Sequence, residues 1–173
     1  NHHASVPSFS VKKFQETVFH TIEKSDDLIT QIVNNDDFSD ETLLNLCSQL
    51  KQEIAIFVFQ DDELLFWNSN LYEINEGAIR KDEQWHFIHL HNAYGIYKWY
   101  NQIDHTSILS FIPIKTDYPY ENDYLIKSFH PRFKIDDSVA ISDSIHHEDM
   151  LIIDPHGDFL FSLIPDPAAN NHK

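Results

Sequence analysis

The run TSILSFIPIK, residues 106–115, decides the fold class of this chain. It is apolar at alternate and at intervening positions, which is typical of a central β-strand that is covered on both faces. Two strand-like runs come before it: IAIFVFQ (54–60) and ELLFWNS (63–69), separated by Asp61 and Asp62 as in a hairpin. The stretch therefore predicts a sheet with a buried middle strand.

More strand-like runs lie on both sides of this stretch. WHFIHLH (85–91) and GIYKWYN (95–101) flank a turn predicted from His91 to Gly95. After it come SVAIS (138–142), MLIID (150–154) and FLFSLI (159–164), with the last two joined by the turn DPHGD. We expect a mostly antiparallel sheet over about residues 54–164.

A long amphipathic helix is predicted ahead of the sheet, over residues 9–33. Its apolar residues follow a period of 3.6: Val11, Phe14, Val18, Ile22, Ile29 and Ile32. About 25 residues extend about 37 Å as a helix, which is longer than one core needs. Part of this helix is therefore expected to project or to pair with a second copy.

A short helix is predicted between the long helix and the sheet, over about residues 40–51. Ser39 suits the N-cap, and Asp40 and Glu41 suit the positive end of the helix dipole. Two helices followed by strands place the chain in the α+β class, as a single domain over residues 1–173. Within the second helix Cys47 lies among leucines, so we expect a buried thiol.

Composition excludes several classes of function. Twelve Lys and Arg against 28 Asp and Glu give a net charge of −16, which repels nucleic acid. The three glycines leave no glycine-rich phosphate loop or nucleophile elbow. No apolar run is long enough to span a membrane. We expect neither an enzyme nor a cofactor site, and because the chain opens on Asn1 rather than Met, we expect it to be a piece of a longer protein.

Histidines leave a metal-dependent hydrolase open as an alternative. His89 and His91 are two apart on a predicted strand and would share a face, and His146 and His147 form a second pair. Neither pair has a third ligand identifiable by spacing, so the histidines are interpreted as polar surface and no metal site is predicted.

Aromatic side chains supply the candidates for ligand binding. Alternation places Tyr97 and Trp99 on one face of their strand and Ile96, Lys98 and Tyr100 on the other. Residues 111–133 add Tyr118, Tyr120, Asn122, Asp123 and Arg132, in a proline-stiffened connection expected to lie over the sheet or its edge. The alternative is that these tyrosines only seal the sheet edge.

Four phrases together resemble a known family: IFVFQDDELLFWNSN, GIYKWYN, LSFIPIKTDYPYENDYLIKSFHPRF and IIDPHGDFLFSLI. They are similar to the extracytoplasmic N-terminal sensor regions of Bacteroidetes-type membrane sensor histidine kinases, over roughly residues 54–164. The resemblance implies a PAS-like or Cache-like fold with a ligand pocket on one face of the sheet.

The resemblance also implies a function. The segment would be the periplasmic ligand-sensing part of an inner-membrane two-component kinase, with membrane helices on either side and the kinase elsewhere. It would bind an unknown small molecule and form a homodimer through the long helix. A free-standing extracytoplasmic binding or interaction protein is the alternative from another class.

Overall fold

A computed structural model describes residues 9–35, 37–50, 52–101 and 104–165. The helices are α1 (Val11–Val33) and α2 (Asp40–Cys47), with short 3₁₀ helices η1 (Glu76–Ala78), η2 (Pro131–Phe133) and η3 (Glu148–Met150). The strands are β1 (Ala55–Gln60), β2 (Glu63–Trp67), β3 (His86–His89), β4 (Ala93–Asn101), β5 (Thr106–Thr116), β6 (Ala140–Ser142), β7 (Leu151–Ile153) and β8 (Phe159–Ile164). The α+β class and the helix-then-strand order are confirmed.

Strand β5 lies in the middle of a five-stranded antiparallel sheet, in the order β2-β1-β5-β4-β3. Its side chains belong to two hydrophobic cores, one on each face of the sheet. Ile108 and Ile112 pack beneath α1, whereas Leu109 and Phe111 pack on the opposite face. The prediction of a central strand covered on both sides is confirmed.

The last three strands form a second antiparallel sheet, in the order β6-β8-β7. The sequence predicted these strands and the turn between β7 and β8 correctly, but as parts of one sheet. Local alternation shows which residues form a strand and not which strands pair, so the division into two sheets could not be read from it.

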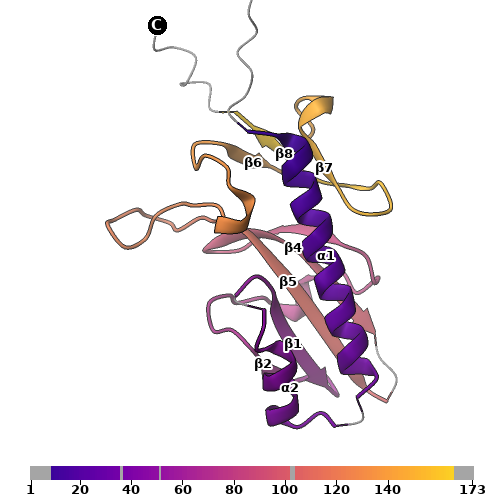
Figure 1. Ribbon diagram of the computed structural model, residues 1–173. Coiled ribbons are helices and arrows are strands. Elements are labelled where there is room, and N and C mark those ends of the chain that lie inside the picture. The colour runs from indigo at the N-terminus through magenta and orange to yellow at the C-terminus, as the bar shows by residue number, and fades with distance from the viewer. Residues whose placement is uncertain (1–8, 36, 51, 102–103, 166–173) are drawn as a thin grey trace, which may run out of the picture.

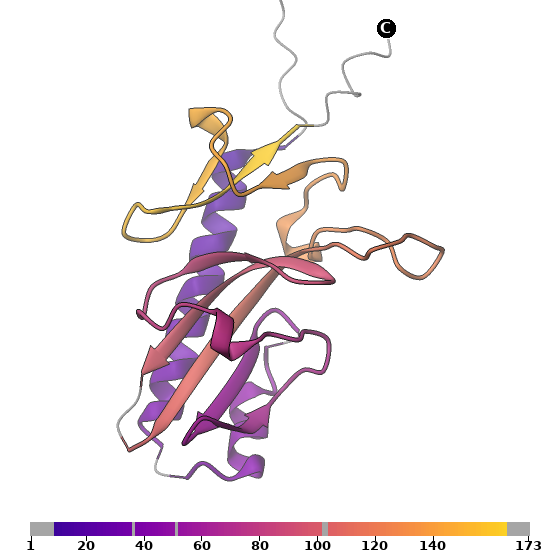
Figure 2. The same cartoon turned by 180° about the vertical axis from the view of Figure 1, so that it is seen from behind.

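Helix α1 runs along one face of the five-stranded sheet and continues onto the second sheet (Figure 1). The connection between β2 and β3 covers the opposite face, where Tyr72, Ile74 and Ile79 pack against the core (Figure 2). The Gln15 side chain of α1 accepts a hydrogen bond from the N–H of Ile153 on β7, at 2.8 Å, and donates one to the Ile153 carbonyl, at 2.9 Å. The length of α1 is thus used within the molecule, because the helix serves both sheets.

Helix α2 is capped as predicted and ends earlier than predicted. The Ser39 hydroxyl accepts from the Thr42 N–H, and the helix stops at Cys47 instead of continuing to residue 51. Cys47 is 7% exposed, and burial raises the pKa of its thiol to about 11. The prediction of a buried thiol is confirmed.

The hairpins differ from prediction in one turn. Asp61 and Asp62 adopt φ angles of 51° and 66° and close the β1–β2 turn as expected. The predicted turn from His91 to Gly95 is shorter, because β4 already begins at Ala93. Gly95 lies inside that strand, where an added Cβ would come within 2.3 Å of the Phe111 ring. Glycine is thus required there for packing and not for a turn.

The start of α1 and the end of β8 lie at the same end of the molecule (Figure 1). Within the described ranges, the helices are too short or too polar to cross a membrane.

Candidate functional site

A cleft of about 460 Å³ lies where β5 ends. Five separate parts of the chain line it: the segment before β1, the connection after β2, the start of β4, the end of β5 and the segment that leads into η2. Its lining residues are Gln52, Leu71, Tyr72, Asn92, Ala93, Pro113, Ile114, Lys115, Thr116, Tyr118, Ser128, Phe129, His130 and Pro131.

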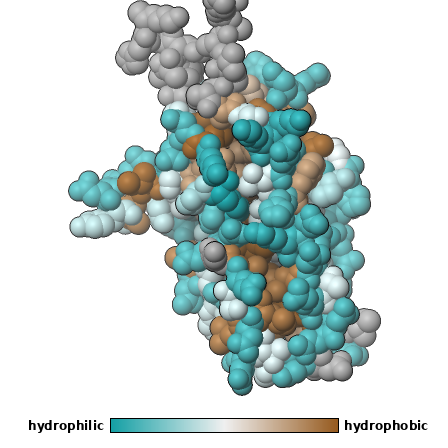
Figure 3. Space-filling model, in the orientation of Figure 1, coloured by the Kyte–Doolittle hydropathy of each residue, from teal (hydrophilic) through white to brown (hydrophobic). Residues whose placement is uncertain are grey.

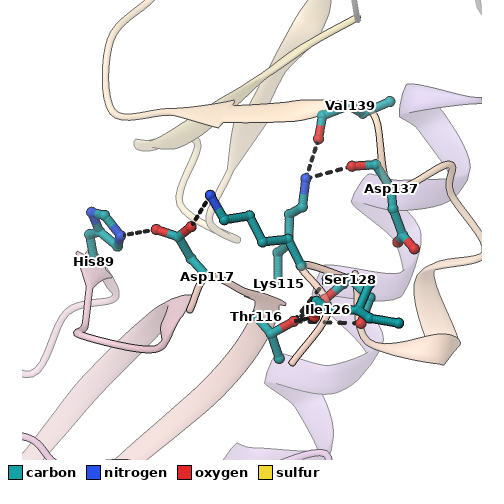
Figure 4. Close-up of polar contacts among 9 residues, drawn as sticks. His89, Lys115, Thr116, Asp117, Ile126, Ser128, Asp137 and Val139 are labelled. Carbon is teal, nitrogen blue, oxygen red and sulfur yellow. Dashed lines mark hydrogen bonds and ion pairs between the residues drawn. The ribbon is translucent and has the colours of Figure 1, made fainter. Parts of the chain in front are cut away.

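Backbone pairing builds one wall of this cleft. The chain leaves β5 after Thr116 and returns at Ser128, where the two residues exchange hydrogen bonds: the Thr116 N–H donates to the Ser128 carbonyl, and the Ser128 N–H to the Thr116 hydroxyl, each at 2.8 Å (Figure 4). The His130 N–H then donates to the Ile114 carbonyl at 2.9 Å. Residues 128–130 therefore extend the sheet edge for one short stretch and hold their side chains at the cleft.

Lys115 is a buried cation in this wall, with 9% of its surface exposed. Its Nζ donates to the carbonyls of Asp137 and Val139, at 2.8 and 2.7 Å (Figure 4). Burial lowers the pKa of Lys115, and the nearby Asp137 and Asp117 oppose that effect. Among the described residues no carboxylate forms an ion pair with it.

Arg132 is a second cation near the cleft, although its side chain lines a separate hollow at the start of α1. Its Nη2 donates to the carbonyl of Pro113, a lining residue, at 2.7 Å. Its Nε and Nη1 are buried and have no acceptor among the residues the structure describes. Burial lowers the pKa of Arg132 to about 10, although Glu53 and Tyr72 act in the opposite direction. A buried guanidinium with unused donors is costly and calls for an explanation.

His130 lines the cleft beside Lys115 and is two residues before Arg132. Burial, followed by the charge of Arg132, lowers the pKa of His130 to about 4 despite the opposing effect of Glu53. The imidazole is therefore neutral at neutral pH. Its Nδ1 accepts a hydrogen bond from the Arg132 N–H at 3.4 Å, which assigns the remaining proton to Nε2. Nε2 is thus available as a donor.

Tyr72 and Tyr118 contribute two phenols to the same cleft. The Tyr72 ring packs edge-on against Phe111, with 4.9 Å between ring centroids. Burial and the neighbouring Tyr118 both raise the pKa of Tyr72. Neither phenol oxygen forms a hydrogen bond within the described parts of the chain.

Of the residues predicted as ligand contacts, Tyr97 and Trp99 lie elsewhere. They share a face of β4, as alternation predicted, and belong to the core on the side away from α1. They are 5% and 3% exposed. The Tyr97 hydroxyl accepts from the Arg80 N–H at 3.0 Å, and Trp99 Nε1 donates to Asn101 Oδ1 at 2.9 Å. Neither residue lines the cleft.

The residues predicted in the connection after β5 are also separated by the structure. Tyr118 lines the cleft and Arg132 lies near it, whereas the segment with Tyr120, Asn122 and Asp123 projects from the molecule instead of lying over the sheet (Figures 1 and 2). Tyr120 is 66% exposed. The Asn122 side chain accepts from two N–H groups of this projecting loop and shapes its tip.

A polar network borders the cleft on its outer side. His89 Nε2 lies 2.6 Å from Asp117 Oδ2, and Lys127 Nζ lies 3.3 Å from Asp117 Oδ1 (Figure 4). Burial alone would raise the pKa of Asp117, but the hydrogen bonds from His89 and Lys127 outweigh it and lower that pKa. His91 does not join this pair, and within the described chain no three His, Cys, Asp or Glu side chains are placed to hold a metal ion.

His146, from the other predicted histidine pair, contacts a hydroxyl and not an acid. Its Nε2 lies 2.9 Å from the Ser142 Oγ. The hydrolase alternative thus gains no ligand set from the described residues.

A second, apolar hollow lies between α2 and β2. Leu44, Leu65 and Trp67, which are 56%, 40% and 47% exposed, line about 330 Å³ together with Asp40 and Phe66. The space-filling view also shows an apolar area between α1 and α2, surrounded by hydrophilic residues (Figure 3). These surfaces carry few groups that could orient a polar ligand.

Sequence reasoning missed most of the residues that form the cleft, among them Tyr72, Asn92, Lys115 and His130. One signal was present: Lys115 is the single cation within the apolar run 106–115. A lysine at such a position either ends the strand at the surface or is buried with polar partners for its ammonium group.

Comparison with family models, with curated proteins and with solved structures finds no match to this chain.

Proposed function

We propose that the chain is the extracytoplasmic ligand-sensing domain of a two-component sensor histidine kinase, and that its cleft at the end of β5 takes a small molecule. The observation that carries the proposal is the cleft itself. It combines apolar walls with phenol, imidazole and amide groups on a sheet edge, which is typical of small-molecule sites.

The architecture supports this proposal. A long helix lying along a five-stranded antiparallel sheet is the arrangement that a PAS-like or Cache-like sensor requires. The start of α1 and the end of β8 lie at one end of the molecule, so flanking segments could reach the same membrane surface. The localisation proposed is therefore the periplasmic side of an inner membrane.

A route from the cleft to α1 also supports a sensing role. Lys115 ties the cleft wall to Asp137 and Val139, which lead directly into β6. Strand β6 pairs with β8, β8 pairs with β7, and Gln15 joins β7 to α1. A ligand that shifts the cleft wall would thereby bias the position of the second sheet against the helix.

In the proposed dimer, two copies of α1 would meet through their outer faces. The apolar side of α1 is buried in its own molecule, so this contact would rest on exposed residues such as Lys12, Glu16 and Glu23. The catalytic step belongs to another part of the parent protein, and this segment acts by binding.

A free-standing binding protein is the second candidate. The observation that favours it is that α1 already buries its apolar face on both sheets and needs no partner to do so. The two functions differ in oligomeric state: a sensor domain dimerises through α1 when it is tethered, whereas a free-standing binder stays monomeric.

A thermal-shift screen against sugars, amino acids and organic acids tests the binding function. We expect at least one compound to raise the Tm with increasing concentration, because a ligand that binds only the folded state stabilises it by mass action. Tyr118→Ala should abolish the shift. Tyr124→Ala is the matched control, since Tyr124 lies on the projecting loop and is 92% exposed.

Two outcomes would contradict the proposal. In one, no compound in the screen stabilises the protein. In the other, the Tyr124 variant loses the response as fully as the Tyr118 variant, which would mean that the cleft is not the binding site.

A further inference from the structure

The cleft gathers positive charge in a strongly acidic protein. The net charge is −16, yet Lys115 lines this cleft, and the guanidinium of Arg132, which lines a separate hollow at the start of α1, is hydrogen-bonded to the cleft residue Pro113. Neither forms an ion pair with a carboxylate of the described residues. Two unpaired cations taken out of water are unfavourable unless something supplies the opposite charge.

The nearby carboxylates of the chain are already engaged. Glu53 pairs with Lys24 at 3.0 Å, and Asp117 is held by His89 and Lys127. Asp137, the acid with the largest effect on Lys115, accepts a hydrogen bond from the Phe129 N–H at 3.0 Å and forms no described ion pair. The protein therefore leaves the positive potential of the cleft for a group from outside.

Neutral donors complete the site. The phenols of Tyr72 and Tyr118 have no described hydrogen-bond partner. His130 carries its proton on Nε2, because Nδ1 accepts from the backbone, and no described residue accepts from this Nε2–H. These groups donate hydrogen bonds, as an anion requires. The apolar side chains of Pro113, Ile114 and Phe129 beside them suit the carbon skeleton of an organic molecule.

We propose that the cleft binds the carboxylate of a small organic acid. Tyr72, Tyr118 and His130 donate hydrogen bonds to the carboxylate, and Lys115 and Arg132 stabilise its charge at longer range. This inference rests on the proposed binding function and narrows it to one chemical class. In this role Lys115 and Arg132 are positioning residues that set the potential, since the unpaired Nε and Nη1 of Arg132 are covered by other atoms.

Matched pairs of probes that differ only in charge test this class: succinate against succinamide, and benzoate against benzamide, with inorganic phosphate, sulfate and glucose alongside. We expect a carboxylate to raise the Tm by about 3–6 °C at roughly ten times its Kd, and its amide to give no shift. The carboxylate effect should weaken with added salt less than a surface effect would, because the site is partly buried.

Variants of the chain's two arginines test whether the positive charge that acts on the carboxylate is that of Arg132. Arg132→Gln should reduce carboxylate affinity about tenfold or more, whereas Arg132→Lys should keep most of it. Arg80→Gln is the matched control, because Arg80 is exposed and lies outside the cleft. Without ligand, Arg132→Gln should be no less stable than the parent protein, because it removes an unpaired buried charge.

Tyr118→Phe and Tyr72→Phe provide a second readout if Arg132→Gln does not fold. Each removes one hydroxyl donor and keeps the aromatic ring, and each should weaken carboxylate binding.

The outcomes separate the two proposals. In one outcome, glucose or an amide stabilises the protein, Tyr118→Ala abolishes this effect, and no carboxylate stabilises it. That outcome overturns the proposal that the ligand is an organic acid and leaves the proposed binding function in place. Stabilisation by phosphate or sulfate alone also overturns the organic-acid proposal. A carboxylate effect that survives Arg132→Gln and Tyr118→Phe overturns the location, and no effect from any probe removes support from both proposals.

Discussion

Lys115 and Arg132 are two buried cations whose burial could not be predicted from the sequence. Lys115 ends the run 106–115, in which every other residue is apolar, Ser or Thr, and it looks like the polar end of a strand. Arg132 looks like one polar residue in a connection. Their burial depends on residues 128–139 folding back against the end of β5, which is a long-range event. Arg132 was predicted as a ligand contact. In the structure its guanidinium does not line the cleft but donates a hydrogen bond to the carbonyl of the lining residue Pro113.

His130 gives a pH prediction at the same scale. The pKa of His130 is lowered from 6.5 to about 4, first by burial and then by Arg132, with Glu53 opposing. Between these two values the unfolded chain holds a proton at this residue that the folded chain does not. Stability therefore falls as pH falls from about 6.5 to about 4, with a contribution from His130 on the order of 1–3 kcal/mol.

Urea unfolding at several pH values measures this effect. In His130→Gln the loss of stability between pH 6.5 and 4 should be smaller than in the parent protein. His20→Gln serves as the control, because His20 is an exposed residue of α1, and it should keep the parent slope. If the free energy of unfolding falls equally between pH 6.5 and 4 in all three proteins, His130 is not the source of the pH dependence.

Helices and strands are the scale at which the sequence was most informative. The apolar period predicted α1, the change to alternation predicted all eight strands, and alternation placed Tyr97 and Trp99 on one face of β4. The division into two sheets and the early end of α2 were missed, and so were two further features. The extra length of α1 belongs to the second sheet, and Gly95 lies inside a strand against Phe111, because both depend on partners far away in the chain.

Gln15 gives a prediction about how these elements are joined. Its side chain makes two hydrogen bonds with the Ile153 backbone, at 2.8 and 2.9 Å, and so completes the edge of β7. Gln15→Ala should leave these backbone groups without a protein partner and loosen β7 against α1.

Amide hydrogen exchange measures the loosening. Exchange at Ile153 should become about tenfold faster or more in Gln15→Ala, while the amides of β5 keep their protection. Glu16→Ala, at the neighbouring exposed position, should leave Ile153 unchanged. If Ile153 exchanges at the same rate in all three proteins, α1 does not hold the second sheet through Gln15.

At the scale of the whole molecule, the cleft is a product of topology. It combines the end of β5 with the connection after β2, the start of β4 and the segment before η2, which are far apart in sequence. The aromatic candidates Tyr97 and Trp99 were chosen for their residue type, and the fold uses them in a core. Tyr118 was chosen for its place after the central strand, and the fold brings it to the cleft.

The proposed sensing route also depends on the whole molecule. Strand β5, the connection through Asp137 and Val139, the second sheet and α1 form one continuous set of contacts from the cleft to the end of the molecule where α1 begins. In the proposed kinase, a change at the cleft would reach the membrane by this set of contacts.

The most direct test of ligand binding at the cleft is a two-dimensional ¹⁵N NMR titration of the protein with the compound that raises its Tm most in the screen. We expect the largest amide shift changes on Asn92, Thr116, Ser128 and His130, around the cleft. Largest changes at Leu44, Leu65 and Trp67, or at Tyr97 and Trp99, would contradict it and place the ligand elsewhere.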